Sequence, residues 1–161
     1  MLMKNKYFFL STFYPCSIKL EIDGKICEFN NAEAAFQAQR NPEIADKWSQ
    51  IKPLEAKRLG DEIITTVPDW EHYQLYAMAK VLNAKFKDKV LFSHLLLIDK
   101  EIVNDNYWGD DFWGVCTNKQ TNYTPKGKNL LGKMLTNIKE NNNDLNKLND
   151  YIKNELIKDV D

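Results

Sequence analysis

One stretch of eleven residues, 104–114, does most to limit what this chain can fold into. It reads Asn-Asp-Asn-Tyr-Trp-Gly-Asp-Asp-Phe-Trp-Gly, so it holds three carboxylates, four aromatic side chains and two glycines. Neither helical nor strand periodicity fits this pattern, and Gly109 and Gly114 indicate a loop. Aromatic side chains in a loop have no regular element of their own to bury them. They either pin the loop to the rest of the protein or line a site for a flat ligand.

The segments on either side of this loop predict a fold that is mainly α with a small β element (α+β). Tyr7–Leu10 is a short apolar run that predicts a buried strand. Ser17–Phe29 predicts an antiparallel hairpin, because hydrophobic alternation continues on both sides of Asp23-Gly24. Residues 100–103 form a further candidate strand that leads into the loop. Helical spacing and capping residues predict helices over residues 30–40, 43–51, 54–65, 69–86, 88–98, 127–139 and 144–158.

Length and composition predict one globular domain without a membrane span. The chain has 161 residues, of which 43% are apolar and 28% charged, and its net charge of −1 gives no bulk attraction to nucleic acid or membranes. We expect residues 1–140 to form the domain and a helix within residues 141–161 to dock on it. The apolar side of that helix is too short for a coiled coil, which favours a monomer.

The cysteines and histidines predict no metal site and no cofactor. Cys16, Cys27 and Cys116 lack CxxC spacing and have few histidine partners. An odd number of cysteines without a secretion signal predicts a cytoplasmic protein. His72 and His94 are isolated in the sequence, which is typical of surface or structurally satisfied histidines.

Glu33 has two alternative interpretations. Asn30 can cap a helix with Glu33 at its third position, where a capping residue contributes about 1 kcal/mol. Alternatively, Glu33 is a carboxylate at a helix N-terminus that faces a pocket, with Gln37 four residues further on along the same face. The neighbouring Ala34 and Ala35 are small enough to leave room for a ligand.

Two other segments carry cations that suit phosphate. Lys57 and Arg58 are adjacent on a predicted helix, where they form either a solvated face or a grip for a phosphate. Gly127-Lys128-Asn129 precedes a predicted helix and resembles an anion site at a helix N-terminus, although it lacks the spacing of a P-loop. The polar tract from residue 117 to residue 126 is expected to be mobile, in contrast to an ordered first half of the loop.

Together these residues supply the parts of a nucleotide N-glycosidase, provided that the fold brings them together. Trp113 can stack on a flat heterocycle, and the cations can hold phosphates. Cleavage of a glycosidic bond passes through an oxocarbenium-like cation, which one carboxylate stabilises while another group activates water or assists the leaving group. Glu33 and Asp110 are the candidates for that work.

Six segments, in order from about Phe8 to Ile138, resemble the NADAR family, also called YbiA-like. Phe9–Pro15 resembles its FLSNFYP-type opening, and Glu33–Arg40 resembles its E-x-x-F-Q-A-x-K/R helix. Pro53–Gly60 is similar to its P-x-x-A-K-x-x-G segment. The other three matches are a Trp followed by an M-x(6)-K-F pattern at Trp70, Met78, Lys85 and Phe86, the N-x-W-x-D-x-x-W-G signature at 106–114, and the closing G-K-N-x-L-G at 127–132.

The resemblance implies a helix-rich fold and hydrolysis of N-glycosidic bonds in ribosylated compounds. The substrates it implies are ADP-ribosylated guanine bases, free or within DNA or RNA, or phosphoribosyl intermediates of the riboflavin pathway. Carried over by position, Glu33 and Asp110 are the catalytic carboxylates. The substrate-binding residues are Trp70, Trp113, Gly114, Gln37, Lys57, Arg58, Lys128 and Asn129.

The chain departs from the family pattern at three places. Thr12 replaces the usual Asn of the opening motif, and Asn104 stands where many members carry an acid. The segment between Gly114 and Gly127 is longer than in compact members. Besides the hydrolase, two alternatives stay open at this point: a non-catalytic module that binds ADP-ribose or NAD, and a structural domain that uses the aromatic loop as an interface.

Overall fold

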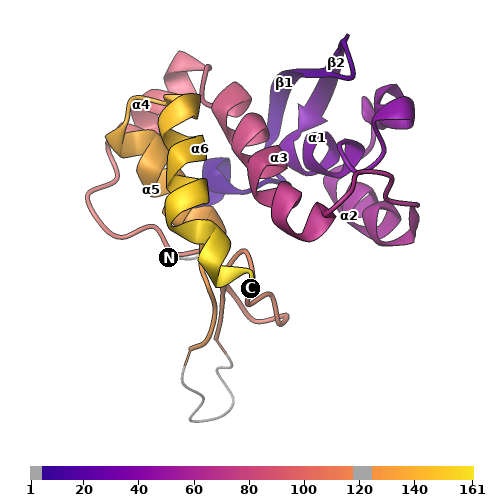
Figure 1. Cartoon of the computed structure of the whole chain (residues 1–161). Coiled ribbons are helices and arrows are strands. Elements are labelled where there is room, and N and C mark those ends of the chain that lie inside the picture. The colour runs from indigo at the N-terminus through magenta and orange to yellow at the C-terminus, as the bar shows by residue number, and fades with distance from the viewer. Residues whose placement is uncertain (1–4, 118–124) are drawn as a thin grey trace.

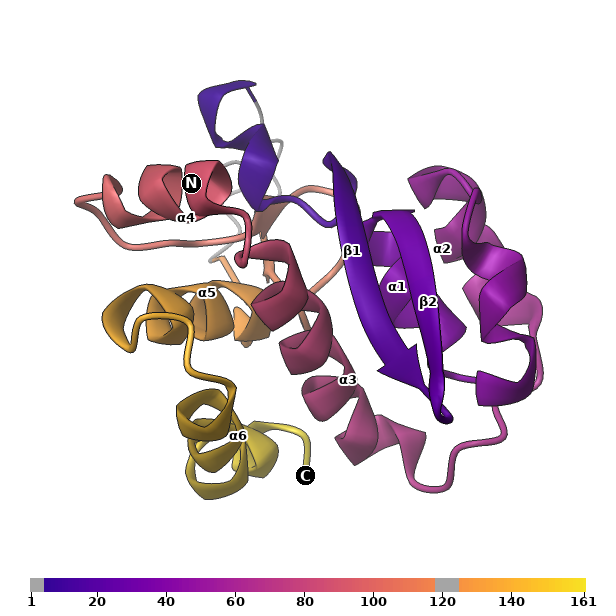
Figure 2. The same cartoon turned by 90° about the horizontal axis from the view of Figure 1, so that it is seen from above.

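Helix α3 (Trp70–Lys85) runs through the middle of the protein. The computed structural model describes residues 5–117 and 125–161. Figure 1 shows two groups of elements on opposite sides of α3, and the view from above in Figure 2 gives the same division. One group is β1 (Pro15–Ile22), β2 (Lys25–Asn31), α1 (Ala32–Ala38) and α2 (Pro53–Glu62); the other is α4 (Lys89–Leu96), α5 (Leu130–Glu140) and α6 (Leu145–Asn154).

The predicted hairpin is confirmed, and it packs against α1 and α3. β1 and β2 are antiparallel, with Ile18 opposite Phe29. Asp23 (φ 52°) and Gly24 (φ 74°) form the turn, and positive φ at both positions matches the twist of the paired strands. Alternate residues of each strand are buried, and that face packs on α1 and α3. The fold is therefore helix-rich with a small antiparallel sheet, as the sequence predicts.

Helix α1 is buried along its whole length. Each of its seven residues is buried, and it packs against the hairpin, α2 and α3. Four of the seven are alanines, which let these neighbours approach closely. Any polar side chain on such a helix must find a partner within the protein or face an internal cavity.

The second group of helices packs through leucines and isoleucines. Asp88 and Asp144 cap α4 and α6 by accepting hydrogen bonds from backbone N–H groups. Leu148 and Ile152 of α6 are fully buried, and α6 packs on α3 and α5. The division of the chain at residue 140 stays a prediction. Within the described ranges, no helix is long and apolar enough to cross a bilayer.

Both predicted strands outside the hairpin are wrong. Tyr7–Leu10 lies in the 3-10 helix η1 (Asn5–Leu10), since periodicity in so short an apolar run cannot separate strand from helix. Residues 100–103 form no strand. The short parallel pairing instead joins β3 (Asp105–Asn106) to β4 (Val115–Cys116).

Several helix boundaries also differ from the prediction, because tertiary hydrogen bonds set them. The segment predicted as helix 43–51 is the 3-10 helix η2 (Pro42–Trp48). α2 stops at Glu62, and the following chain turns back to bond the carbonyl of Arg40. Beyond α6 the chain continues as the 3-10 helix η3 (Leu156–Asp159).

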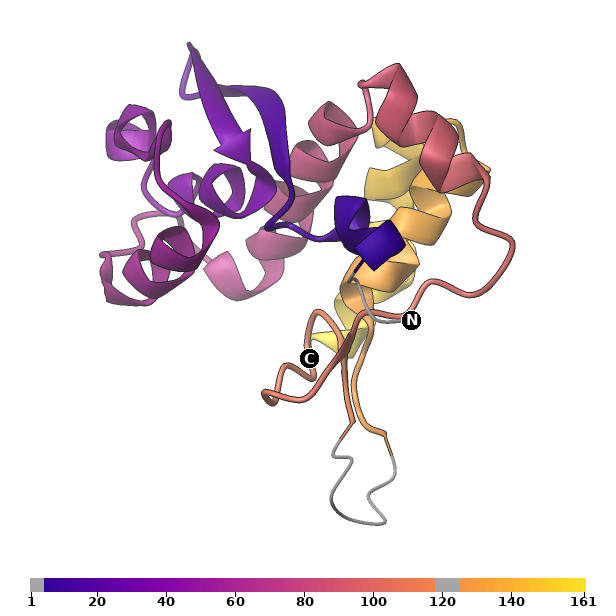
Figure 3. The same ribbon diagram turned by 180° about the vertical axis from the view of Figure 1, so that it is seen from behind.

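Residues 113–117 and 125–128 run side by side away from the helices (Figure 3). The predicted mobility of residues 117–126 falls mostly outside the described residues.

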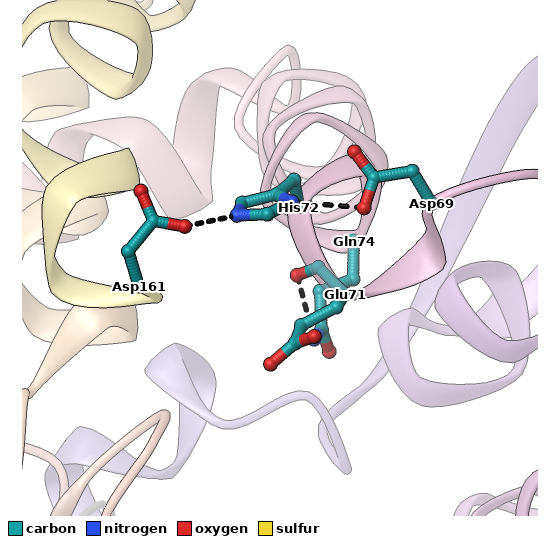
Figure 4. Close-up of polar contacts among 5 residues, drawn as sticks. All are labelled: Asp69, Glu71, His72, Gln74 and Asp161. Carbon is teal, nitrogen blue, oxygen red and sulfur yellow. Dashed lines mark hydrogen bonds and ion pairs between the residues drawn. The ribbon is translucent and has the colours of Figure 1, made fainter.

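His72 ties the last residue of the chain to the start of α3. Its Nδ1 lies 2.8 Å from Oδ1 of Asp69, and its Nε2 lies 2.6 Å from Oδ1 of Asp161 (Figure 4). These two hydrogen bonds raise the pKa of His72 to about 9. His72 is thus a structurally satisfied histidine, which is the interpretation that its isolation in the sequence favours.

Candidate active site

A cavity of about 480 Å³ opens where the N-terminal turn, α1, α2, α3 and the aromatic loop meet. Its size falls within the roughly 300–1,000 Å³ of small-molecule sites. Of the predicted site residues, the described lining contains Glu33, Gln37, Lys57, Asp110 and Trp113. The other lining residues are Ser11, Thr12, Phe13, Phe36, Arg40, Asp61, Gln74, Met78, Asn104, Asp105, Trp108, Gly109 and Leu131.

Glu33 lies on α1 with its carboxylate held at both oxygens. Thr12 Oγ1 donates to Oε2 at 2.8 Å, and Gln37 Nε2 donates to Oε1 at 2.9 Å. Asn31, not Asn30, is the N-cap, and its Oδ1 accepts from the Ala34 N–H at 2.8 Å. Because the helix begins one residue later than expected, the predicted capping box is wrong. The side chain of Glu33, only 8% exposed, serves the cavity instead.

Asp110 is fixed by the loop and keeps one oxygen available. The fully buried Asn106 grips the backbone of Asp110: its Nδ2 donates to the Asp110 carbonyl at 2.5 Å and its Oδ1 accepts from the Asp110 N–H at 2.9 Å. Asp110 Oδ1 accepts from the backbone N–H groups of Phe112 and Trp113. Oδ2 has no hydrogen bond to any residue that the structure describes. The loop therefore presents one free carboxylate oxygen in a fixed position.

The two tryptophans of the loop differ in their surroundings. Trp113 is half-buried and packs edge-on against Phe36, with ring centres 5.6 Å apart. Trp108 is 55% exposed, and the ammonium of Lys57 lies 5.8 Å from its ring centre. Trp113 thus pins the loop to α1 while lining the cavity, and Trp108 offers an open ring face at its edge. Trp113 thus fits the alternative in which the loop is pinned to the body, while a flat ligand on Trp108 stays a prediction.

The cations that line the cavity are not the pair that the sequence predicts. Lys57 lines it, but Arg58 lies on the exposed side of α2 and pairs with Glu62 at 3.0 Å. Neighbouring residues on a helix point about 100° apart, and here only Lys57 of the pair points into the cavity. Arg40 is the second lining cation, and its Nε donates to Gln37 Oε1 at 2.7 Å. Burial lowers the pKa of the Arg40 guanidinium, while the charges of Asp61 and Glu33 act in the opposite direction.

The N-terminus of α5 is taken by the protein's own carbonyls. The backbone N–H groups of residues 128–131 donate to carbonyl oxygens of residues 111–114. Asn129 uses its side chain to bond residues 102 and 104, and the Lys128 ammonium lies 5.4 Å from the Phe112 ring centre. At Gly114 a Cβ atom would lie 2.3 Å from the Asn104 carbonyl oxygen. These residues hold the aromatic loop in place, and the geometry does not support the predicted contacts of Gly114, Lys128 and Asn129 with a substrate.

Trp70 lies behind the cavity wall and not among the described lining residues. Its ring is 5.6 Å from that of Phe36, and the guanidinium of Arg40 lies 5.1 Å from its ring centre. The indole Nε1 is buried without a partner in the described structure. Trp70 therefore supports two lining residues, and its predicted contact with substrate has no support in this geometry.

Sequence reasoning missed Thr12, Arg40 and Trp108 as site residues. Arg40 had a usable signal, because positions 33, 37 and 40 repeat at the spacing of one helix face. Thr12 meets Glu33 from a separate segment 21 residues away, and its one signal was that it replaces the usual Asn of the opening motif. Within the residues that the structure describes, no group of three or more His, Cys, Asp or Glu is placed to hold a metal ion.

Comparison with known proteins agrees with this architecture. The sequence model described as "NADAR domain" matches residues 2–141, which include all the described cavity-lining residues. The NMR structure of the E. coli protein YbiA is similar to this chain with a TM-score of 0.67 and 26% sequence identity. That similarity covers 88% of this chain and 83% of the YbiA chain. No curated protein matches the chain.

Proposed function

The chain belongs to the NADAR domain family, and on that premise we propose that it hydrolyses the N-glycosidic bond of a ribosylated compound. The observation that carries the proposal is that Glu33, Asp110 and Trp113, far apart in the sequence, line one cavity. Glu33 is held by hydrogen bonds at both oxygens, whereas Asp110 keeps Oδ2 available. Two carboxylates that differ in this way suit two different tasks in one reaction.

Glu33 supplies a fixed negative charge for the ribosyl ring. Cleavage of the bond to the base leaves an oxocarbenium-like cation, and a carboxylate already in position stabilises it without rearrangement. The charges of the cavity suit such a cation. Of the described lining residues four are carboxylates, namely Glu33, Asp61, Asp105 and Asp110, and two are cations, Lys57 and Arg40.

Asp110 acts as the general base. Its Oδ2 accepts a proton from water, the water oxygen bonds to the anomeric carbon of the ribose, and the bond from that carbon to the base nitrogen breaks. The departing base takes up a proton, so the net reaction adds one water and releases a free base and a ribose with a free anomeric hydroxyl. The hydrogen bonds to Oδ1 keep Oδ2 aimed while this happens.

The rest of the cavity suits the two ends of a nucleotide. A flat base stacks on the open face of Trp108 or against Trp113, and Lys57 contacts a phosphate. ADP-ribosylated guanine and phosphoribosyl intermediates of the riboflavin pathway both have these parts. The three free cysteines fit a cytoplasmic setting for this activity.

The test is an incubation of the purified protein with two substrates, ADP-ribosylated guanosine and a phosphoribosyl pyrimidine. Chromatography should detect release of a free base from at least one of them. If a folded protein releases a base from neither, the proposal fails. Calorimetry with ADP-ribose in parallel separates the alternative of a non-catalytic binding module, which binds this ligand and turns over nothing.

A further inference from the structure

Arg40 lies two residues beyond the end of α1 and is fixed on two sides. Its Nε donates to Gln37 Oε1 at 2.7 Å, and its guanidinium lies 5.1 Å from the ring centre of Trp70. It is half-buried and lines the cavity. A guanidinium so placed can contact a substrate, but its shortest described contact is with another side chain of the site.

The contact with Arg40 holds the Gln37 amide in the orientation that the Glu33 carboxylate also requires. A guanidinium only donates hydrogen bonds, so Gln37 must turn its oxygen toward Arg40. The NH₂ group of the amide then points the other way and donates to Glu33 Oε1 at 2.9 Å. With the amide reversed, Gln37 would place an oxygen against the carboxylate, and two acceptors facing each other repel.

The protein closely encloses the Gln37 amide. Gln37 is only 4% exposed, and a Cβ atom at Gly60 of α2 would lie 2.1 Å from its Oε1. The backbone of α2 therefore lies directly against the amide and blocks its movement toward that helix. Asp61, the next residue, faces the charge of Arg40 from the same helix.

The geometry points to Arg40 as a positioning residue, which acts through Gln37 to hold the Glu33 carboxylate in the orientation that hydrolysis requires; this inference rests on the proposed function. Gln37, predicted to bind substrate, is then the link between the two charged groups. Thr12 holds the second oxygen of Glu33 independently of this link. Loss of Arg40 leaves the carboxylate in the cavity but with one of its two oxygens no longer fixed.

The kinetic test is a double-mutant cycle with Arg40→Met and Gln37→Met, assayed on the substrate that the wild type turns over. Arg40→Met should lower kcat and kcat/KM alike, on the order of 10- to 100-fold, because a misplaced catalytic group costs that much. In the Gln37→Met background the same change should add less than about 3-fold, since the two residues act in one chain. Arg58→Met, an exposed arginine on α2, is the matched control and should change neither parameter.

The second test does not depend on activity. The side-chain ¹⁵N–¹H signals of Gln37 should shift and broaden in Arg40→Met and stay as in the wild type in Arg58→Met. Unchanged Gln37 signals in Arg40→Met overturn the inference, as does a higher KM with unchanged kcat, which would make Arg40 a direct substrate contact. A wild-type protein that releases no base overturns the proposed function, and with it the catalytic part of the inference, while the Gln37 signals still decide the link to Arg40.

Discussion

At the scale of single residues, the two oxygens of Asp110 have separate roles that two substitutions distinguish. Asp110→Asn keeps an oxygen that accepts from the N–H groups of Phe112 and Trp113, but it replaces the charged Oδ2 with an uncharged NH₂ group. We expect kcat to fall at least 100-fold with little change in stability. Asp110→Ala should lose the same activity and also about 1 kcal/mol of unfolding free energy, because the loop loses its hydrogen bonds. Steady-state kinetics and urea denaturation measure the two effects.

The pair of Asp110 variants also shows what would contradict these roles. An Asp110→Asn protein with near wild-type kcat means that Asp110 is not the base. An Asp110→Ala protein as stable as Asp110→Asn means that Oδ1 does not hold the loop. Asp111→Asn is the matched control, since Asp111 is exposed and absent from the described lining of the cavity.

Gly60 offers a way to displace Gln37 without changing any charge. An alanine there would place its Cβ 2.1 Å from Gln37 Oε1, so the flexible side chain of Gln37 must shift. Alanine favours a helix over glycine by roughly 1 kcal/mol, which offsets the cost of that shift. We expect Gly60→Ala to lower kcat on the order of 10- to 100-fold while the melting temperature changes little. Wild-type kcat in a folded Gly60→Ala protein would contradict the close packing of α2 on Gln37.

At the scale of elements, local signals predict what local interactions determine. The hairpin follows from Asp23-Gly24 and alternation, and Asp88 caps the helix that the sequence predicts over residues 88–98, because both features depend on neighbouring residues. The N-terminal 3-10 helix and the start of α5 were not predictable in this way. The first is a short apolar run that suits either conformation, and the second is set by carbonyls of residues 111–114.

The tie between α3 and the end of the chain predicts a dependence of stability on pH. The folded-state pKa of His72, about 9, lies above its ordinary value of 6.5. The contacts with Asp69 and Asp161 therefore stabilise the fold fully below about pH 6.5, and this contribution is lost as the pH rises through 9. We expect wild type to melt at a higher temperature than His72→Gln at pH 6 and at the same temperature at pH 10. A difference that persists unchanged at pH 10 would show that the charge of His72 is not its cause.

At the scale of the whole molecule, the candidate site depends on contacts that no local pattern contains. The loop of residues 104–114 comes from the side of α3 that carries α4 and α5. It lines one cavity together with α1 and α2, which lie on the opposite side of α3. Sequence reasoning identified Glu33, Asp110, Trp113, Gln37 and Lys57 as members of a site, and the fold does bring them to one cavity. It also predicted Arg58, Lys128 and Asn129 as members, but none of them is among the described lining residues. The direction of Arg58 depends on the rotation of its helix, and the backbone N–H groups of residues 128 and 129 bond carbonyl oxygens of the chain itself.

The measurement that tests the central claim most directly is base release by wild type and by Glu33→Gln, with melting curves of both. Glutamine at position 33 can still accept from Gln37 and bond Thr12, so the fold should persist while the fixed negative charge is gone. We predict that wild type releases the free base, and that Glu33→Gln releases it at least 100-fold more slowly while melting within a few degrees of wild type. Equal rates of release from the two folded proteins would contradict the account, since Glu33 would then not act on the ribosyl bond.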